Sequence, residues 1–130
     1  MLLLMKYMGI DYGTKKVGIA VSNEDGTMAF PREVVPNDEK LLAALVTFIE
    51  KEHIEAIVIG HSLDRTGAPN KVQSAVEELI GDLTLEVGVP IHLEPEQYTT
   101  QAALRLQGRN DKTDASAAAL ILDSYLMRVK

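Results

Sequence analysis

The spacing of apolar residues changes near residue 37, and this change constrains the fold more than any other feature of the chain. Before it, apolar residues alternate with small or polar ones, as Val17, Ile19 and Val21 do within Val17–Ser22. After it, apolar residues recur at intervals of three and four, which is typical of amphipathic helices. The chain is therefore expected to begin with strands and to continue with helices that alternate with further strands.

The first part contains three strand patterns, over Lys6–Ile10, Val17–Ser22 and Thr27–Val35. Gly26 can adopt the left-handed conformation that the turn before the third strand needs. Pro31 cannot donate a hydrogen bond to a neighbouring strand, so this third strand is expected at an edge of the sheet or interrupted there.

The second part begins where Asn37 or Asp38 can cap a helix whose apolar stripe runs through Leu41–Ile49. The continuous apolar run in Glu55–Gly60 is typical of a strand that is buried on both faces. The remaining elements are expected to be a helix over Val72–Leu83, a strand over Pro90–Leu93, a short helix from Thr99 or Thr100 through Leu106, and a last helix from Thr113 to about Val129.

This order predicts an α/β fold with a mixed five-stranded sheet, in which three antiparallel strands come first and parallel strands follow, covered by helices. The 130 residues fit a single domain over 1–130. The chain lacks cysteine, which excludes disulfides, thiolate zinc sites and cysteine nucleophiles. The apolar run Met1–Met5 is too short for a signal peptide or a membrane helix, so we expect a cytoplasmic protein without membrane association, either a monomer or a homodimer.

Three acidic residues are placed where a catalytic site could form. Asp11 closes the first strand, Glu96 follows the Pro90–Leu93 strand, and Asp114 lies in the first turn of the last helix. Sites in open α/β sheets gather at the carboxyl ends of parallel strands, so these carboxylates converge if the strands are neighbours. Converging carboxylates repel one another, and Mg²⁺ or Mn²⁺ would remove that repulsion and suit phosphodiester hydrolysis. Alternatively, Asp11 shapes a turn, Glu96 is a solvated loop acid, and Asp114 interacts with the helix dipole.

The basic residues near these acids are few. Thr14, Lys15 and Lys16 could hold a nucleic-acid phosphate or form a solvated turn, and Arg109 and Lys112 could contact nucleic acid or form a solvated face. With 19 acidic and 13 basic side chains, the net charge is −6, which argues against nucleic-acid binding through bulk positive charge.

Several segments together resemble one family. Gly9–Ser22 closely resembles the opening of the YqgF (RuvX-like) family, and the resemblance continues in order along nearly the whole chain. The further segments that carry it are Ile57–Gly60 with Leu63 and Gly67, Tyr98-Thr99-Thr100, and Asp114 with Ala117-Ala118, Ile121-Leu122 and Ser124-Tyr125-Leu126.

The resemblance implies a ribonuclease H-like fold and a nuclease, described either as a Holliday junction resolvase or as an enzyme that matures the 5′ end of pre-16S ribosomal RNA. It also implies that Asp11, Glu96 and Asp114 are catalytic, metal-binding carboxylates. The partner would then be structured RNA or branched DNA.

Two other functions stay open at this point. Where the family usually has Asp-Glu-Arg, this chain has Pro95-Glu96-Gln97, which suggests a nucleic-acid-binding module of the same fold with weak or no activity. The glycine-rich turn Gly9–Thr14 also resembles the opening of ATP-binding domains of the actin and sugar-kinase type. Those enzymes close two such domains around a nucleotide, and this chain supplies one.

Overall fold

The computed structural model describes residues 5–13, 15–61, 71–95 and 113–129. Its strands and helices are β1 (Tyr7–Tyr12), β2 (Lys16–Ser22), β3 (Ala29–Pro36), α1 (Leu41–Glu52), β4 (Ala56–His61), α2 (Lys71–Val87), β5 (Ile91–Pro95) and α4 (Thr113–Val129). The short helix predicted to end at Leu106 lies outside the described residues.

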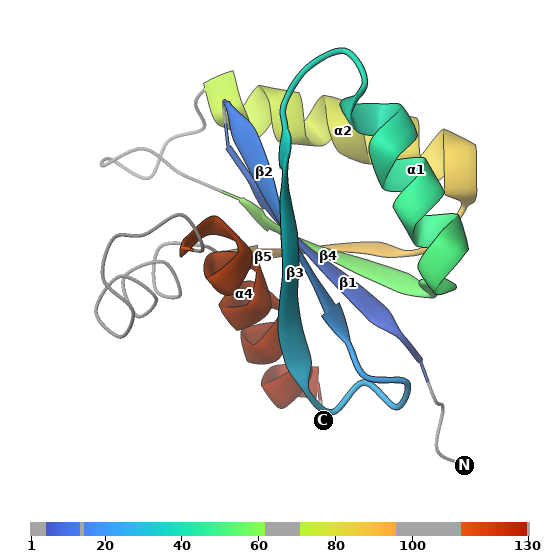
Figure 1. Cartoon of the computed structure of the whole chain (residues 1–130), viewed down its shortest axis with the longest axis vertical. Coiled ribbons are helices and arrows are strands. Elements are labelled where there is room, and N and C mark those ends of the chain that lie inside the picture. Colours follow the sequence, from blue (N-terminus) through green and yellow to red (C-terminus); the bar gives the residue numbers. More distant parts are fainter. Residues whose placement is uncertain (1–4, 14, 62–70, 96–112, 130) are drawn as a thin grey trace.

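The strands form one five-stranded sheet in the order β3-β2-β1-β4-β5. β1 pairs antiparallel with β2, and β2 pairs antiparallel with β3. β4 is parallel to β1, and β5 is parallel to β4. Helices α1 and α2 cover one face of the sheet and α4 covers the other (Figure 1). The mixed sheet predicted from the sequence is confirmed.

The apolar core has two layers, one on each face of the sheet. Ile57 and Ile59 of β4 belong to the layer beneath α1 and α2. Val58, between them, packs with Ile121 and Leu122 of α4 in the other layer. β4 is therefore buried on both faces, as its continuous apolar run predicts.

The edge strand β3 confirms the interpretation of Pro31. Pro31 pairs with Ala20 and Glu33 pairs with Ile19, so Arg32 is an extra residue that bulges from the ladder. Gly26, in the turn before this strand, has a φ angle of +69° and is in the predicted left-handed conformation.

Several predicted boundaries are wrong. α2 continues to Val87 instead of ending at Leu83, β5 continues to Pro95 instead of Leu93, and β3 begins at Ala29 instead of Thr27. β1 continues through Tyr12, which pairs with Val17, so Asp11 lies inside the strand instead of closing it.

Asn37 does not cap α1, because its Nδ2 atom donates to the carbonyl oxygen of Gly13 at 2.7 Å. Asp38 does not cap the helix either, because the N-cap of α1 is Lys40, which has no side-chain cap hydrogen bond. The Oδ1 atom of Asp38 accepts from the backbone N–H of Lys40 at 2.9 Å, in the turn before the helix.

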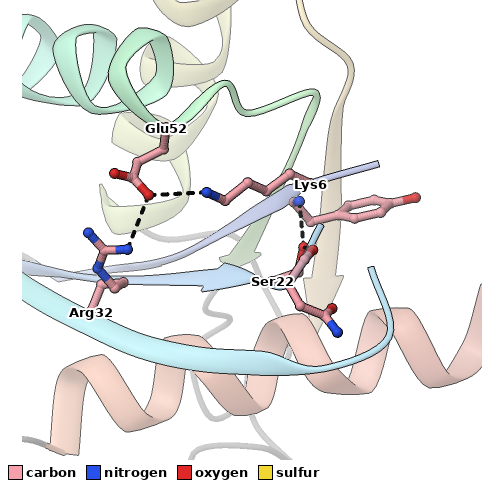
Figure 2. Close-up of polar contacts among 6 residues, drawn as sticks. Lys6, Ser22, Arg32 and Glu52 are labelled. Carbon is pink, nitrogen blue, oxygen red and sulfur yellow. Dashed lines mark hydrogen bonds and ion pairs between the residues drawn. The ribbon is translucent and has the colours of Figure 1, made fainter. Parts of the chain in front are cut away.

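An ion-pair network ties the end of α1 to the sheet (Figure 2). One carboxylate oxygen of Glu52 lies 3.2 Å from Nζ of Lys6 and 3.1 Å from a guanidinium nitrogen of Arg32. The hydrogen bond from Lys6 lowers the pKa of Glu52, and Arg32 lowers it further against the opposing effect of burial. Helix α1 is thus attached to both the central strand and the edge strand.

No helix in the described part of the chain is long and apolar enough to cross a membrane.

Candidate functional site

Asp11 is a buried acidic residue near the carboxyl end of the central strand. It is 8% exposed and sits on β1, with β2 on one side and β4 on the other. Burying a carboxylate is costly unless hydrogen bonds, an opposite charge or a metal compensates. Asp11 does make a polar or electrostatic interaction in this structure, which offsets part of that cost.

The residues beside Asp11 on both neighbouring strands are glycines. Asp11 is in register with Gly18 of β2 and with Gly60 of β4. Residues in register on adjacent strands project to the same face of the sheet, with Cβ atoms about 5 Å apart. Because neither glycine has a side chain, nothing from these two positions occupies the space on either side of the carboxylate.

Sequence reasoning did not find these two glycines as part of the site. A signal was present for Gly18, since Gly18, Ala20 and Ser22 are the small residues that alternate with the apolar residues of this segment. A strand with one small-residue face permits close approach of another element or a ligand. Gly60 ends a continuous apolar run, where the alternation gives no such signal.

Gly9 brings α4 unusually close to the face of the sheet that carries Asp11. A Cβ atom on Gly9 would lie 2.8 Å from the carbonyl oxygen of Ala118 and 2.9 Å from Cβ of Leu122. Side chains two residues apart on a strand point to the same face, so the Asp11 side chain projects to the α4 face.

The direction of α4 places its first turn at the level of Asp11. The rings of Tyr7 and Tyr125 lie 6.0 Å apart at the start of β1, while Gly9 meets Ala118, so α4 runs antiparallel to β1. From Gly9 to Asp11 the strand advances about 7 Å, and from Ala118 back to Asp114 the helix advances about 6 Å. The turn of α4 that contains Asp114 therefore lies level with Asp11, although the Asp114 side chain is outside the described residues.

The edge strand β5 ends at the same border of the sheet. Glu94 is in register with Gly60, which is in register with Asp11. Two strand spacings separate the backbones of Asp11 and Glu94, a distance of about 10 Å. Glu96, the predicted ligand, lies outside the described residues, which end at Pro95 on this strand.

The predicted nucleic-acid contacts are described only in part. Lys15 and Lys16 are exposed at the turn between β1 and β2, just beyond Asp11. Thr14, Arg109 and Lys112 lie outside the described residues.

Of the three predicted metal ligands, only Asp11 has a side chain among the described residues. Among the described residues, no group of three or more His, Cys, Asp or Glu side chains could hold a metal ion. The side chains of Glu96 and Asp114 are not in that set, so the predicted Mg²⁺ or Mn²⁺ site is untested. The donors of the predicted set are hard carboxylate oxygens, which fit either ion.

Comparison with known proteins identifies one family. Residues 5–128 match the model of the family RuvX, described as Holliday junction resolvase. A relative from Rickettsia peacockii (strain Rustic), named "Putative pre-16S rRNA nuclease", is 33% identical over 133 residues, which cover 95% of this chain and 86% of that protein.

Solved structures with the same architecture include two resolvases. T. thermophilus RuvC in complex with a Holliday junction substrate has a TM-score of 0.63 at 20% identity, with 96% of each chain covered. The fowlpox virus Holliday junction resolvase has a TM-score of 0.63 at 13% identity, with 95% of this chain and 99% of that chain covered. These similarities show the ribonuclease H-like fold that the family resemblance implies.

Proposed function

The chain belongs to the RuvX family, described as Holliday junction resolvase, and from this premise we propose that it is a metal-dependent nuclease. Its substrate would be structured nucleic acid, either the 5′ region of pre-16S ribosomal RNA or branched DNA. The observation that carries the proposal is the buried carboxylate of Asp11 between two glycines, level with the helical turn that contains Asp114.

The residues that would hold the metal are Asp11, Glu96 and Asp114. Mg²⁺ or Mn²⁺ bound to them would lower the pKa of a water molecule and neutralise the charge that develops on the phosphate. The protein's own contribution is to hold Asp11 on a central strand, in register with a glycine on each neighbouring strand. Strands and helices fix such carboxylates more firmly than loops do.

Substrate binding would come from a small number of bases. Lys15 and Lys16 are exposed at the end of the sheet where Asp11 lies, and they would contact the phosphate backbone together with Thr14. Arg109 and Lys112 would add contacts from the segment before α4. So few bases imply binding that is weak and sensitive to salt.

The proposal is tested by replacing Asp11 with asparagine, which keeps the shape of the side chain and removes its charge. Cleavage of a four-way DNA junction and of a structured pre-ribosomal RNA fragment is measured with Mg²⁺ and with Mn²⁺. Asp11→Asn should reduce the rate at least about 100-fold, because both the ion and the attacking water depend on this carboxylate. The matched control is Asp82→Asn, an exposed residue of α2 on the opposite face of the sheet, which should cleave at the wild-type rate.

Metal binding is measured separately by thermal unfolding. Saturating Mn²⁺ should raise the melting temperature of the wild type and of Asp82→Asn, but not that of Asp11→Asn, because a ligand stabilises only the state that binds it. Unchanged cleavage by Asp11→Asn would refute the assignment. A wild type that binds nucleic acid but never cleaves it would instead support the weakened binding module, motivated by Pro95 and Gln97.

The cytoplasmic location and the monomeric or homodimeric state stay predictions.

A further inference from the structure

Asn37 makes two hydrogen bonds to the turn between β1 and β2. Its side-chain Nδ2 atom donates to the carbonyl oxygen of Gly13 at 2.7 Å, and its backbone N–H donates to the carbonyl oxygen of Lys15 at 2.9 Å. Asn37 follows directly after β3, so these bonds connect the turn to a distant part of the chain. The two acceptors lie on either side of residue 14, and Asn37 therefore holds both halves of the turn.

The turn itself is tightly constrained. β1 ends at Tyr12 and β2 begins at Lys16, which pairs with Pro36 at the end of β3. A Cβ atom on Gly13 would lie 2.5 Å from the carbonyl oxygen of Lys16, closer than any real Cβ contact. The backbone therefore closes on itself at this point, and Asn37 fixes it from outside.

The bond from Asn37 to Gly13 does not serve the adjacent helix. Asp38 contacts the start of α1, since its side chain accepts from Lys40 and its carbonyl oxygen accepts from the backbone N–H of Leu41 at 3.0 Å. Asn37 lies three residues before Lys40, the N-cap of α1, and its side chain binds a turn 24 residues earlier in the sequence. The side chain thus acts on the turn that carries Lys15 and Lys16.

We propose that Asn37 is a positioning residue for nucleic-acid binding, which holds the β1–β2 turn so that Lys15 and Lys16 meet the phosphate backbone beside Asp11. This inference rests on the proposed function. A turn ordered before the substrate arrives loses less conformational entropy on binding, so the lysines contribute more to affinity.

The test compares Asn37→Ala with Asp38→Ala, a matched control that removes one side-chain to backbone hydrogen bond from the neighbouring residue. Cleavage kinetics on the four-way junction and the RNA fragment give KM and kcat, and binding is measured across a range of salt concentrations. Asn37→Ala should raise KM roughly tenfold and change kcat less than about threefold. It should also reduce the slope of log affinity against log salt by about 1 to 2 on duplex arms, as one or two phosphate contacts are lost.

A structural role alone predicts a different pattern. Asp38→Ala, and any variant that only destabilises the fold, should lower the melting temperature while the salt slope stays at the wild-type value. Asn37→Asp provides a second variant of nearly the same size, whose carboxylate cannot donate to Gly13. It should raise KM at least as much as Asn37→Ala does.

A double-mutant cycle supplies the decisive comparison. If Asn37 acts through the lysines, Asn37→Ala should have little further effect on KM once Lys15 and Lys16 are both alanine. Additive effects, or an unchanged salt slope in both Asn37 variants, would overturn the inference while wild-type cleavage leaves the proposed function standing. A wild type that neither binds nor cleaves these substrates would overturn both.

Discussion

Replacing Gly9 with alanine tests how closely α4 must approach the central strand. The new Cβ atom would lie 2.8 Å from the carbonyl oxygen of Ala118 and 2.9 Å from Cβ of Leu122, where ordinary contacts begin at 3.4 Å. Helix α4 must therefore move by about 0.5 to 0.6 Å, or the contact stays strained. Overpacking of this kind costs about 1 to 3 kcal/mol, and the upper half of that range applies because one of the atoms met belongs to the backbone.

The assay is unfolding by heat and by urea, with Gly81→Ala as the matched control. A Cβ atom on Gly81, inside α2, would meet nothing within 4 Å. Because alanine favours helix over glycine by about 0.8 to 1.0 kcal/mol, this variant should be more stable than the wild type. At about 4 °C per kcal/mol for a chain of this size, Gly9→Ala should lower the melting temperature by about 8 to 12 °C, and Gly81→Ala should raise it by about 3 to 4 °C.

The same substitution links packing to the proposed site. Because Asp114 lies one turn before Ala118, a shift of α4 also moves the backbone that carries Asp114 relative to Asp11. Misplacement of catalytic groups by 1 Å can cost about 100-fold in rate, so cleavage by folded Gly9→Ala should fall by about tenfold or more. Equal stability of Gly9→Ala and the wild type would refute the close-packing argument, whatever the activity.

Two further predictions concern the opposite end of the sheet. Glu52→Gln should lose about 1 kcal/mol of stability at pH 7, because it removes the charge that pairs with Lys6 and Arg32. The folded-state pKa of Glu52 is lowered, so the wild-type advantage is present at neutral pH and should be lost as the pH falls through that lowered pKa, which urea unfolding across the acidic range measures. His53 ends α1 in the left-handed conformation with a φ angle of 56°, so His53→Gly should raise the stability by about 0.5 to 1 kcal/mol in thermal unfolding.

The parts of the fold that the sequence predicts well are those set by burial over a few residues. The alternation in Val17–Ser22 predicts a strand, and the continuous apolar run in β4 predicts a strand buried on both faces; both are confirmed. The alternation does not report burial in β2, because its small residues Gly18, Ala20 and Ser22 are buried as well. The end of β1 is different, because Tyr12 stays in the strand through its pairing with Val17 across the turn. The prediction that Asn37 caps α1 fails for a similar reason. Its side chain instead donates to the carbonyl oxygen of Gly13, a residue that is distant in the sequence.

The candidate site shows the same division. Asp11 could be identified because an acid directly after an apolar run is less ordinary than an acid in a loop, although the strand itself continues to Tyr12. Gly18 and Gly60 could not, since their role depends on being in register with Asp11, and register is a property of the assembled sheet. Gly9 is similar, because its contact is with α4, more than 100 residues further along the chain.

A net charge of −6 opposes nucleic-acid binding only where the acidic side chains are near the ligand. Glu24, Glu52 and Glu55 line a cleft with Lys6 at the amino end of β1, whereas Asp11 lies five residues along the strand, about 17 Å away. The Debye length at physiological salt is about 8 Å, so these acids are about two screening lengths from a phosphate beside Asp11. The exposed Lys16 is separated from Gly18, the partner of Asp11, by about 7 Å along β2, within one screening length. Glu24, Glu52 and Glu55 therefore contribute little to the field at the proposed site, so the net charge of the whole chain is a poor guide to the charge that a phosphate there would meet.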